Sequence, residues 1–301
     1  MKKFLKITTI TGVCLTLLGA LTFGIAFGSA GWDVQELSNV KAEQKRYEQK
    51  ADTTIENIVI DVENTDVRVV FDESVETISL DYSQRFKKNG DPIGKITLND
   101  QNGGLRLIEK TSWTDHVLIW DFTADCKTTL TLPANNVYAL SIETDNGDIT
   151  VRGNGKVSSL SLTTDNGDIS TKNATIDCTG KVSLESDNGG MALGNLSAKT
   201  IETETDNGNV KILGRLIAEQ IFFETHNGNI TATAYPIQIN KIAFETHNGN
   251  ITAHLFGASA DYTKMIQTHN GDSNIRSEKG GEKTLIAETH NGDIEITFKT
   301  E

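Results

Sequence analysis

Chemically versatile side chains recur at one position of a repeated motif. Asn-Gly preceded by Asp or His occurs eight times, with Asp in the first four copies and His in the last four. The aspartates are Asp145, Asp165, Asp187 and Asp206, and the histidines are His226, His247, His269 and His290. Carboxylates and imidazoles bind metal ions, and imidazoles exchange protons near neutral pH. This position is therefore the first candidate for function.

The aspartate copies suggest a calcium site. If the copies stack, the first two bring four carboxylates to one corner, namely Asp145, Asp148, Asp165 and Asp168. Oxygen-rich corners of this kind hold Ca²⁺. The sequence does not match the glycine-rich calcium-binding nonapeptide, and only two copies carry the full set. A solvated acidic edge is therefore the competing interpretation, and no other cofactor is expected.

The histidine copies predict a column of four imidazoles. Such a column binds Zn²⁺ in one interpretation and forms a pH-responsive charged ladder in another, since an unperturbed histidine titrates near pH ~6.5. Repetition alone also stacks identical residues. A purely structural row is the third interpretation and the one that we favour.

The Asn-Gly pairs themselves predict a structural turn ladder. Asparagine amides bond along a stack or to the turn backbone, and glycine tolerates the positive φ angles of a tight corner. The asparagines lie 19 to 22 residues apart, at Asn146, Asn166, Asn188, Asn207, Asn227, Asn248, Asn270 and Asn291.

Strands with one buried face must position these residues. In the first copy Leu140, Ile142, Thr144, Ile149 and Val151 alternate with polar residues, which is the period of a strand. A meander of hairpins would satisfy the pattern, but it would set like charges opposite each other and leave the sheet without a cover. A β-solenoid, in which two strands of each coil face each other and neighbouring coils pair in parallel, covers its own core. We therefore predict an all-β parallel β-helix.

The chain divides into four predicted segments. Residues 140–301 form the eight coils, and residues 55–139 form degenerate N-terminal coils or a cap, with turns at Asn64-Thr65-Asp66 and Asn102-Gly103. The last coil is expected to end as an exposed edge, where Lys299 and Glu301 discourage further stacking.

The two remaining segments precede the repeats. Residues 1–32 hold three lysines and then an uncharged apolar run over 7–32, which predicts a transmembrane helix with a cytoplasmic N-terminus. A cleavable signal peptide is the alternative. Residues 33–54 predict a juxtamembrane stalk, either helical or without regular structure.

Composition and missing motifs exclude several functions. The net charge of −13 argues against nucleic acid as a partner. Nucleophile triads, phosphate-binding glycine loops and Cys-x-x-Cys pairs are absent, and the Asp115-His116 pair alone is weak evidence for catalysis. Cys126 and Cys178 are expected to be free thiols, because their predicted separation exceeds the reach of a disulfide.

Outward-facing glutamates predict an acidic stripe beside the threonines of the motif. They are Glu143, Glu185, Glu204, Glu224, Glu245 and Glu288. Such a stripe favours a basic partner or a contact mediated by cations.

The anchor followed by Thr-x-Asn-Gly-Asp-Ile repeats resembles the bacterial "putative adhesin" repeat family of unknown function, which includes membrane-anchored envelope proteins of the LiaG type. The resemblance covers residues 55–301. It implies a β-helical extracytoplasmic domain without established catalysis.

The sequence thus predicts a non-catalytic binding or scaffold module outside the bacterial cell membrane. Its expected partners are the lipid bilayer, through residues 7–32, and an envelope protein or glycan. An envelope-stress regulator that acts through a membrane partner is the alternative, and a cell-wall glycan hydrolase or lyase is a third.

Overall fold

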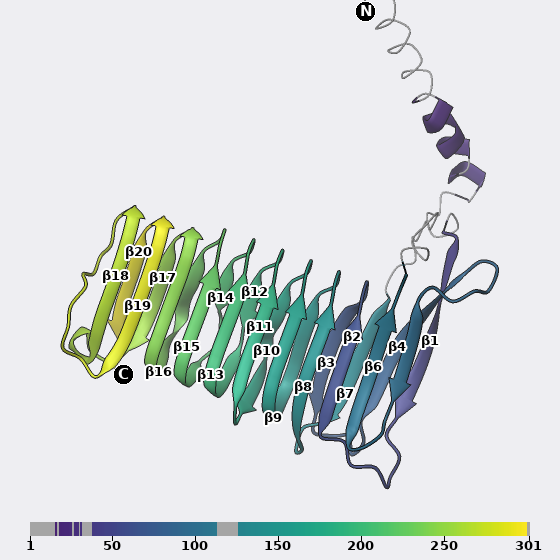
Figure 1. Cartoon of the computed structure of the whole chain (residues 1–301), viewed down its shortest axis with the longest axis horizontal. Coiled ribbons are helices and arrows are strands. Elements are labelled where there is room, and N and C mark those ends of the chain that lie inside the picture. Colours follow the sequence, from purple (N-terminus) through teal and green to yellow (C-terminus); the bar gives the residue numbers. More distant parts are fainter. Residues whose placement is uncertain are drawn as a thin grey trace, which may run out of the picture. The chain divides into compact units, whose positions relative to one another are not determined.

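The computed structural model describes residues 16, 18–25, 27–29, 31, 38–112 and 126–299 and shows an all-β fold after a short helical stretch. Figure 1 shows the strands side by side. They are β1 (Val40–Glu48), β2 (Asn57–Val62), β3 (Asp66–Asp72), β4 (Ser79–Lys87), β5 (Lys95–Asn99), β6 (Gly104–Lys110), β7 (Lys127–Pro133), β8 (Val137–Thr144), β9 (Ile149–Thr164), β10 (Ile169–Cys178), β11 (Lys181–Ser186), β12 (Met191–Leu193), β13 (Asn195–Thr205), β14 (Val210–Ile212), β15 (Leu216–Thr225), β16 (Ile230–Asn248), β17 (Ile251–Phe256), β18 (Tyr262–Asn270), β19 (Lys283–Asn291) and β20 (Ile294–Lys299).

The described residues fall into two compact units. The smaller one contains the described residues up to 43, together with 84–94 and residue 112, and within it Val40 and Ile93 are buried. Lys88 N–H donates to Asn39 O there, at 3.0 Å. The larger unit contains 44–83, 95–111 and 126–299, and it holds all the repeats.

Neighbouring repeats pair in parallel and in register. Val182 lies beside Leu160 on one side and Ile201 on the other, and Ile201 lies beside Ile221. Alternate residues are almost fully buried, so apolar columns of identical register form the core. The predicted all-β fold of parallel strands is confirmed, and a meander of antiparallel hairpins over 140–299 is excluded.

Each coil contains three paired segments, whereas the sequence predicted two strands. In one coil these are 191–193, 195–198 and 200–205, and each pairs with the matching segment of the next coil. Gly194 lies between the first two, and a Cβ there would meet Thr171 O at 2.3 Å. The apolar residues change phase at the two bends, from Leu193 to Leu196 and from Ala198 to Ile201. The prediction of two strands overlooked this signal.

The repeat glycines are needed for close approach and not for positive φ. A Cβ on Gly228 would lie 1.9 Å from Gly208 O, and on Gly249 it would lie 1.8 Å from Gly228 O. None of the eight motif glycines has a positive φ, so the predicted reason was wrong. Asn102 and Gly103 do have positive φ, at 56° and 74°, in the link between the antiparallel strands β5 and β6.

The coil order changes at the C-terminal end of the stack. The last repeat, β19, pairs with β16 on one side and with β18 on the other, so it lies between two earlier repeats. Lys299 pairs with Phe256 inside the sheet, and Asn274 bonds to both the N–H and the C=O of Ile296. The predicted exposed edge at the last coil is therefore wrong, because the penultimate repeat covers it.

The N-terminal end shows the same exchange. Strand β2 lies between β6 and β8, and β3 lies between β7 and β9, so the first repeat is the second coil of the stack. Strands β4 and β5 close this end by antiparallel pairing. Each outermost coil also buries one charged side chain, Glu109 at this end and Lys264 at the other, where Lys264 Nζ meets Glu278 Oε2 at 2.7 Å.

The N-terminal predictions have mixed outcomes. Residues 18–25 are helical, but no helix among the described residues is long and apolar enough to cross a membrane. Residues 40–48 of the predicted stalk form strand β1, because pairing with β4 overrides their weak helical spacing. The Asp115-His116 pair lies outside the described residues. Cys126 and Cys178 are not joined by a disulfide.

Candidate functional site

The motif asparagines form one continuous hydrogen-bond ladder. Each Nδ2 donates to Oδ1 of the asparagine in the adjacent coil, over 2.7 to 3.0 Å. In spatial order the ladder runs through Asn64, Asn146, Asn166, Asn188, Asn207, Asn227, Asn248, Asn291 and Asn270. The predicted turn ladder is thus present, with Asn64 added and the last two copies exchanged.

Two further ladders flank the asparagines. The buried Thr or Ser before the Asp/His position donates its hydroxyl to a backbone carbonyl of the adjacent coil, as Thr225 Oγ1 does to Gly208 O at 2.8 Å. After Asn-Gly, a side-chain oxygen accepts the N–H of the same position in the next coil, as Asn209 Oδ1 does from Asn229 at 2.8 Å. Three residues of each motif thus bond across the coils and fix the register.

Two of the predicted calcium ligands, Asp148 and Asp168, already accept hydrogen bonds in the third ladder. Asp148 Oδ1 accepts the N–H of Asp168 at 2.8 Å, and Asp168 Oδ1 accepts the N–H of Gly190 at 2.7 Å. Asp145 and Asp165 lie in the neighbouring outward row, where partial burial and then the carboxylate of Asp165 raise the pKa of Asp145. Across residues 38–112 and 126–299, no three His, Cys, Asp or Glu side chains are grouped to hold a metal ion.

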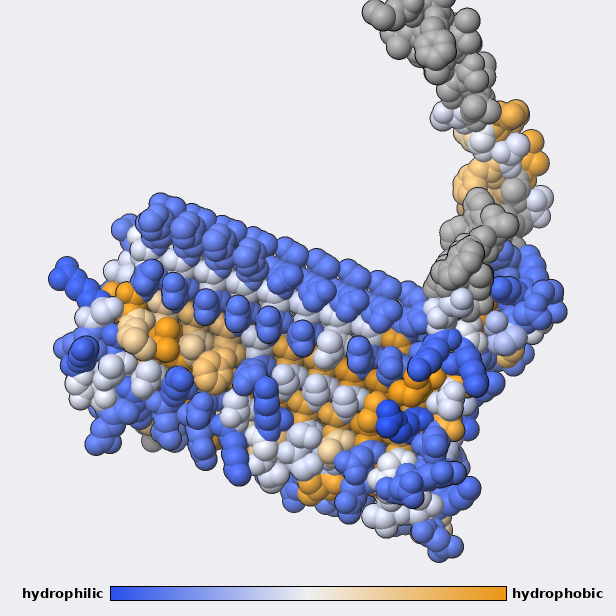
Figure 2. All heavy atoms as spheres, viewed as in Figure 1, coloured by the Kyte–Doolittle hydropathy of each residue, from blue (hydrophilic) through white to orange (hydrophobic). Residues whose placement is uncertain are grey.

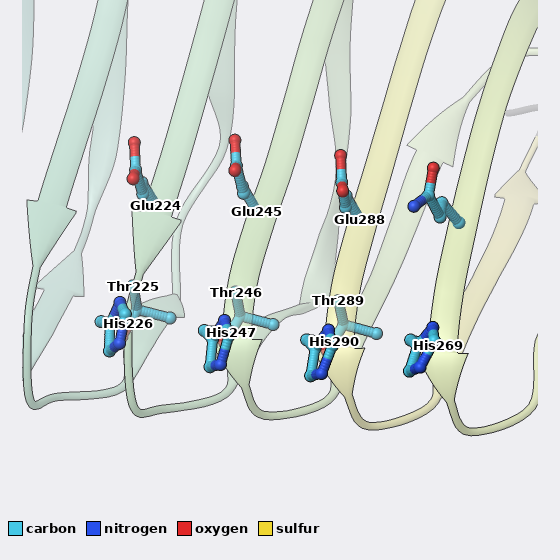
Figure 3. Close-up of a pocket in the computed structure, with 11 residues that line it drawn as sticks. Glu224, Thr225, His226, Glu245, Thr246, His247, His269, Glu288, Thr289 and His290 are labelled. Carbon is cyan, nitrogen blue, oxygen red and sulfur yellow. The ribbon is translucent and has the colours of Figure 1, made fainter.

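The four histidines of the second half form a face-to-face stack. Their ring centroids lie 4.7 to 4.9 Å apart and their planes differ by 3 to 9°. The order is His226, His247, His290 and His269, because the last two repeats are exchanged (Figure 3). Two Zn–N bonds of about 2.0–2.1 Å do not span facing rings at this separation. The stack therefore does not share a zinc ion between adjacent rings.

The predicted glutamate row lies directly beside the Asp and His row. Adjacent pairs such as Glu204 and Glu224, or Glu245 and Glu288, occupy the same register in neighbouring strands. Thr163 interrupts the row after Glu143, and Gln267 ends it. Partial burial, followed by neighbouring carboxylates, raises the pKa of Glu143 and of Glu224.

A third outward row was missed by sequence reasoning. Two residues before each glutamate position, the second half of the repeats carries apolar side chains, in the spatial order Phe222, Ala243, Ile286 and Met265. The first half carries Ser141, Ser161, Ser183 and Glu202 at the same position. The signal was available in the aligned repeats, but this position has no fixed residue type and did not stand out.

The second half of this face is hollowed between its rows. A cavity of about 340 Å³ is lined by the last three members of the glutamate row, by Gln267, by the histidine stack and by the threonines between them (Figure 3). Beside it the ammonium of Lys241 lies 5.1 Å from the centre of the Phe222 ring. Figure 2 shows hydrophilic side chains in regular rows, with hydrophobic residues exposed next to them. This half therefore offers apolar, anionic and imidazole groups side by side.

Solved structures share the fold at low identity. A "putative adhesin" from Parabacteroides distasonis is 15% identical, with 85% of this chain and 97% of that chain aligned and a TM-score of 0.53. One from Parabacteroides merdae is 14% identical over 87% and 95%, with a TM-score of 0.51. A "putative lipid binding protein" from Parabacteroides distasonis is 11% identical over 86% and 97%, with a TM-score of 0.51. No curated protein matches.

The family model agrees with the resemblance inferred from the motif. It matches residues 55–301, which is the segment where the sequence placed all repeats and the N-terminal coils. The similarity to a "putative adhesin" repeat family is thereby confirmed. This chain belongs to the Toastrack DUF4097 family.

Proposed function

We propose that this protein is a non-catalytic binding or scaffold module whose β-solenoid presents its partner with the second half of the outward face. The observation that carries this proposal is that an apolar row and a histidine row flank the glutamate row in the same coils. Phe222 and His226 begin the apolar and histidine rows, which continue through three neighbouring coils. Between them the glutamate row runs through Glu224, Glu245 and Glu288 and ends at Gln267. The first half of the same face has no apolar row.

The partner that fits this surface carries cationic groups next to apolar ones. Glu224, Glu245 and Glu288 attract positive charge, and the adjoining side chains Phe222, Ile286 and Met265 supply apolar contact. Lys241 already illustrates the match, because its ammonium lies over the Phe222 ring. The net charge of −13 is consistent with such a partner and disfavours nucleic acid.

We further propose that the module acts outside the bacterial cell membrane, with residues 7–32 in the lipid bilayer and the N-terminus in the cytoplasm. The uncharged run behind three lysines supports this orientation. The partner on the outer side is an envelope protein or glycan with the chemistry described above. The named relatives support binding, and none of their names describes an enzyme.

Binding of the full-length protein to washed cell envelopes tests the proposal. The variant combining Phe222→Ser with Met265→Ser removes the ends of the apolar row, and one combining Glu245→Gln with Glu288→Gln removes two charges. We expect each to lower the retained fraction at least about tenfold, since truncating the few residues that dominate an interface typically costs about 2 kcal/mol or more.

The matched control makes the same Glu→Gln replacements at two glutamates in the first half of the face. Glu143→Gln with Glu185→Gln also removes two charges of the glutamate row. It leaves intact the second half of the face, where the apolar, glutamate and histidine rows meet, which we call the three-row region. We expect its retention to fall less than threefold. Equal losses in both halves would show that only general charge matters and would contradict the proposal.

A further inference from the structure

The third ladder is interrupted at a single coil, at Gly190. In the other coils of the motif this position is Asp or Asn, whose side-chain oxygen accepts the next coil's N–H, as Asp168 does for Gly190 and Asn209 does for Asn229. Gly190 has no side chain to offer. The N–H of Asn209, which follows it in the stack, therefore has no protein acceptor among the residues that the structure describes.

The missing side chain leaves a notch with hydrogen-bond donors in its wall. The notch has a volume of about 480 Å³, and its lining includes Gly190, Asn209, Ser170, Lys172 and Lys211, together with Asp168. Ser170 Oγ is buried and has no hydrogen-bond partner. Within the described part of the chain, neither lysine forms an ion pair. The wall thus gathers two unsatisfied donors and two ammonium groups.

We propose that this notch binds a carboxylate group, which supplies the oxygen that Gly190 lacks. One carboxylate oxygen accepts the N–H of Asn209, as the side chain of the missing Asp would. Lys172 and Lys211 lie on β10 and β14, on either side of the notch, and balance the charge. Backbone N–H groups and lysines are the usual partners of carboxylates in such concave sites.

The nearby carboxylate of Asp168 does not prevent this binding. Asp168 itself lies one coil after Asp148 in the same ladder, and Asp272 lies beside Asp293, so the column accepts acidic neighbours. At both of those places a carboxylate oxygen accepts the next N–H, over 2.8 Å. A ligand carboxylate at Gly190 would continue the pattern, with the two lysines as an additional stabilising charge.

This site differs from the proposed binding face in position and in charge. It lies after the turn and between two lysines, whereas the three-row region lies before the turn and is anionic. The carboxylate belongs either to an acidic sugar or to a peptide terminus. These two sources share the group that the notch recognises.

Titration of the ¹⁵N-labelled full-length protein with sodium acetate tests the proposal, with sodium chloride at equal ionic strength as the reference. We expect saturable shifts of the amides of Asn209, Gly190 and Met191 in acetate only. Acetamide, which has the same shape without the charge, should bind at least threefold more weakly because it does not pair with the lysines.

Variants separate the notch from other anion sites. Gly190→Asn supplies the missing oxygen from the chain and should abolish the saturable shift. Its Cβ would lie 3.3 Å from Asn209 O, so only a small adjustment is needed. Lys211→Gln leaves Gly190 unchanged and should weaken acetate binding at least threefold, which keeps the test valid if the Asn variant folds poorly.

Two results would overturn the proposal. One is a shift of Asn209 that is equal in chloride and acetate, and the other is acetate binding that Lys211→Gln leaves unchanged. If acetate binds as expected, glucuronate and N-acetylalanine are titrated next. The tighter of the two identifies the carboxylate as that of a sugar or of a peptide.

Discussion

The two halves of the outward face share one backbone design and carry different chemistry. In the first half the three rows are serine or glutamate, then mostly glutamate, then aspartate, whereas in the second half they are apolar, then glutamate, then histidine. The corner residues behind them make the same three ladders in both halves. Repetition therefore fixes the corner, while the outward positions are free to specialise.

The largest effect should come from the glycines that both halves share. Gly167→Ala in the first half and Gly228→Ala in the second would place a Cβ 2.0 and 1.9 Å from a carbonyl oxygen of the adjacent coil. We expect each to lower the free energy of unfolding by roughly 3 kcal/mol or more, because backbone must move.

Urea unfolding followed by circular dichroism measures this effect. Gly190→Ala is the control, since its Cβ would lie 3.3 Å from the nearest atom and should cost less than 1 kcal/mol. If Gly167→Ala were tolerated and Gly228→Ala were not, the two halves would not share one scaffold.

A middle-sized effect is expected from the asparagine ladder. Asn166→Ala and Asn227→Ala each remove one donated and one accepted bond of the ladder, in the first and second half respectively. We expect a loss of about 1–2 kcal/mol in each case, measured by the same urea unfolding.

The end of the ladder supplies its control. Asn270 donates to Asn291 and is the outermost member, so Asn270→Ala removes a single ladder bond. Its cost should be about half of that at Asn166 or Asn227. Equal costs at all three sites would mean that the bonds along the ladder contribute nothing measurable.

The smallest effect concerns charge, and it should differ between the halves. Burial and the carboxylates of Asp61 and Asp145 raise the pKa of Glu143, so the folded state binds protons more tightly than the unfolded state. The contribution of Glu143 to the free energy of unfolding therefore falls as the pH rises from the pKa of this carboxyl in the unfolded chain to its raised pKa in the folded protein. Glu143→Gln should stabilise the protein at pH 7 by less than about 1 kcal/mol, and the gain should vanish below pH ~4.

Thermal unfolding at pH 7 and pH 4 measures this difference between the wild type and the variant. Glu288→Gln is the matched change in the second half, where the flanking row carries His290 in place of an aspartate such as Asp145. It should give a smaller gain at pH 7. A larger gain at Glu288 than at Glu143 would reverse the electrostatic distinction between the halves.

The repeated corner could be predicted because its residue types are fixed by contacts between identical coils. Thr-x-Asn-Gly gave the strand direction, the register and the stacked asparagines and histidines. The role of Gly228 could not be read in the same way, since a need for positive φ and a need for close approach both select glycine. The φ angles of the motif glycines and the distance to Gly208 O distinguish them.

The order of the end coils was also beyond the reach of the repeat pattern. The copies around Asn270 and Asn291 share Thr-His-Asn-Gly-Asp, so the corner motif alone does not say which of them lies next to Asn248. The apolar row was missed because Phe222, Ala243 and Met265 have little in common besides their lack of charge. The interruption at Gly190 was visible as a departure from the motif, but its notch depends on two lysines from other strands.

The exchange of the last two repeats has a consequence for protein synthesis. As the chain leaves the ribosome, the repeat at 262–270 emerges before the one at 283–299, yet its final neighbour is that later repeat. Addition of coils in the order of translation therefore stops at β16 and β17. The layer that contains β18 is added only once residues 283–299 have paired with β16 and β17, so loss of that segment would also leave β18 without its neighbour.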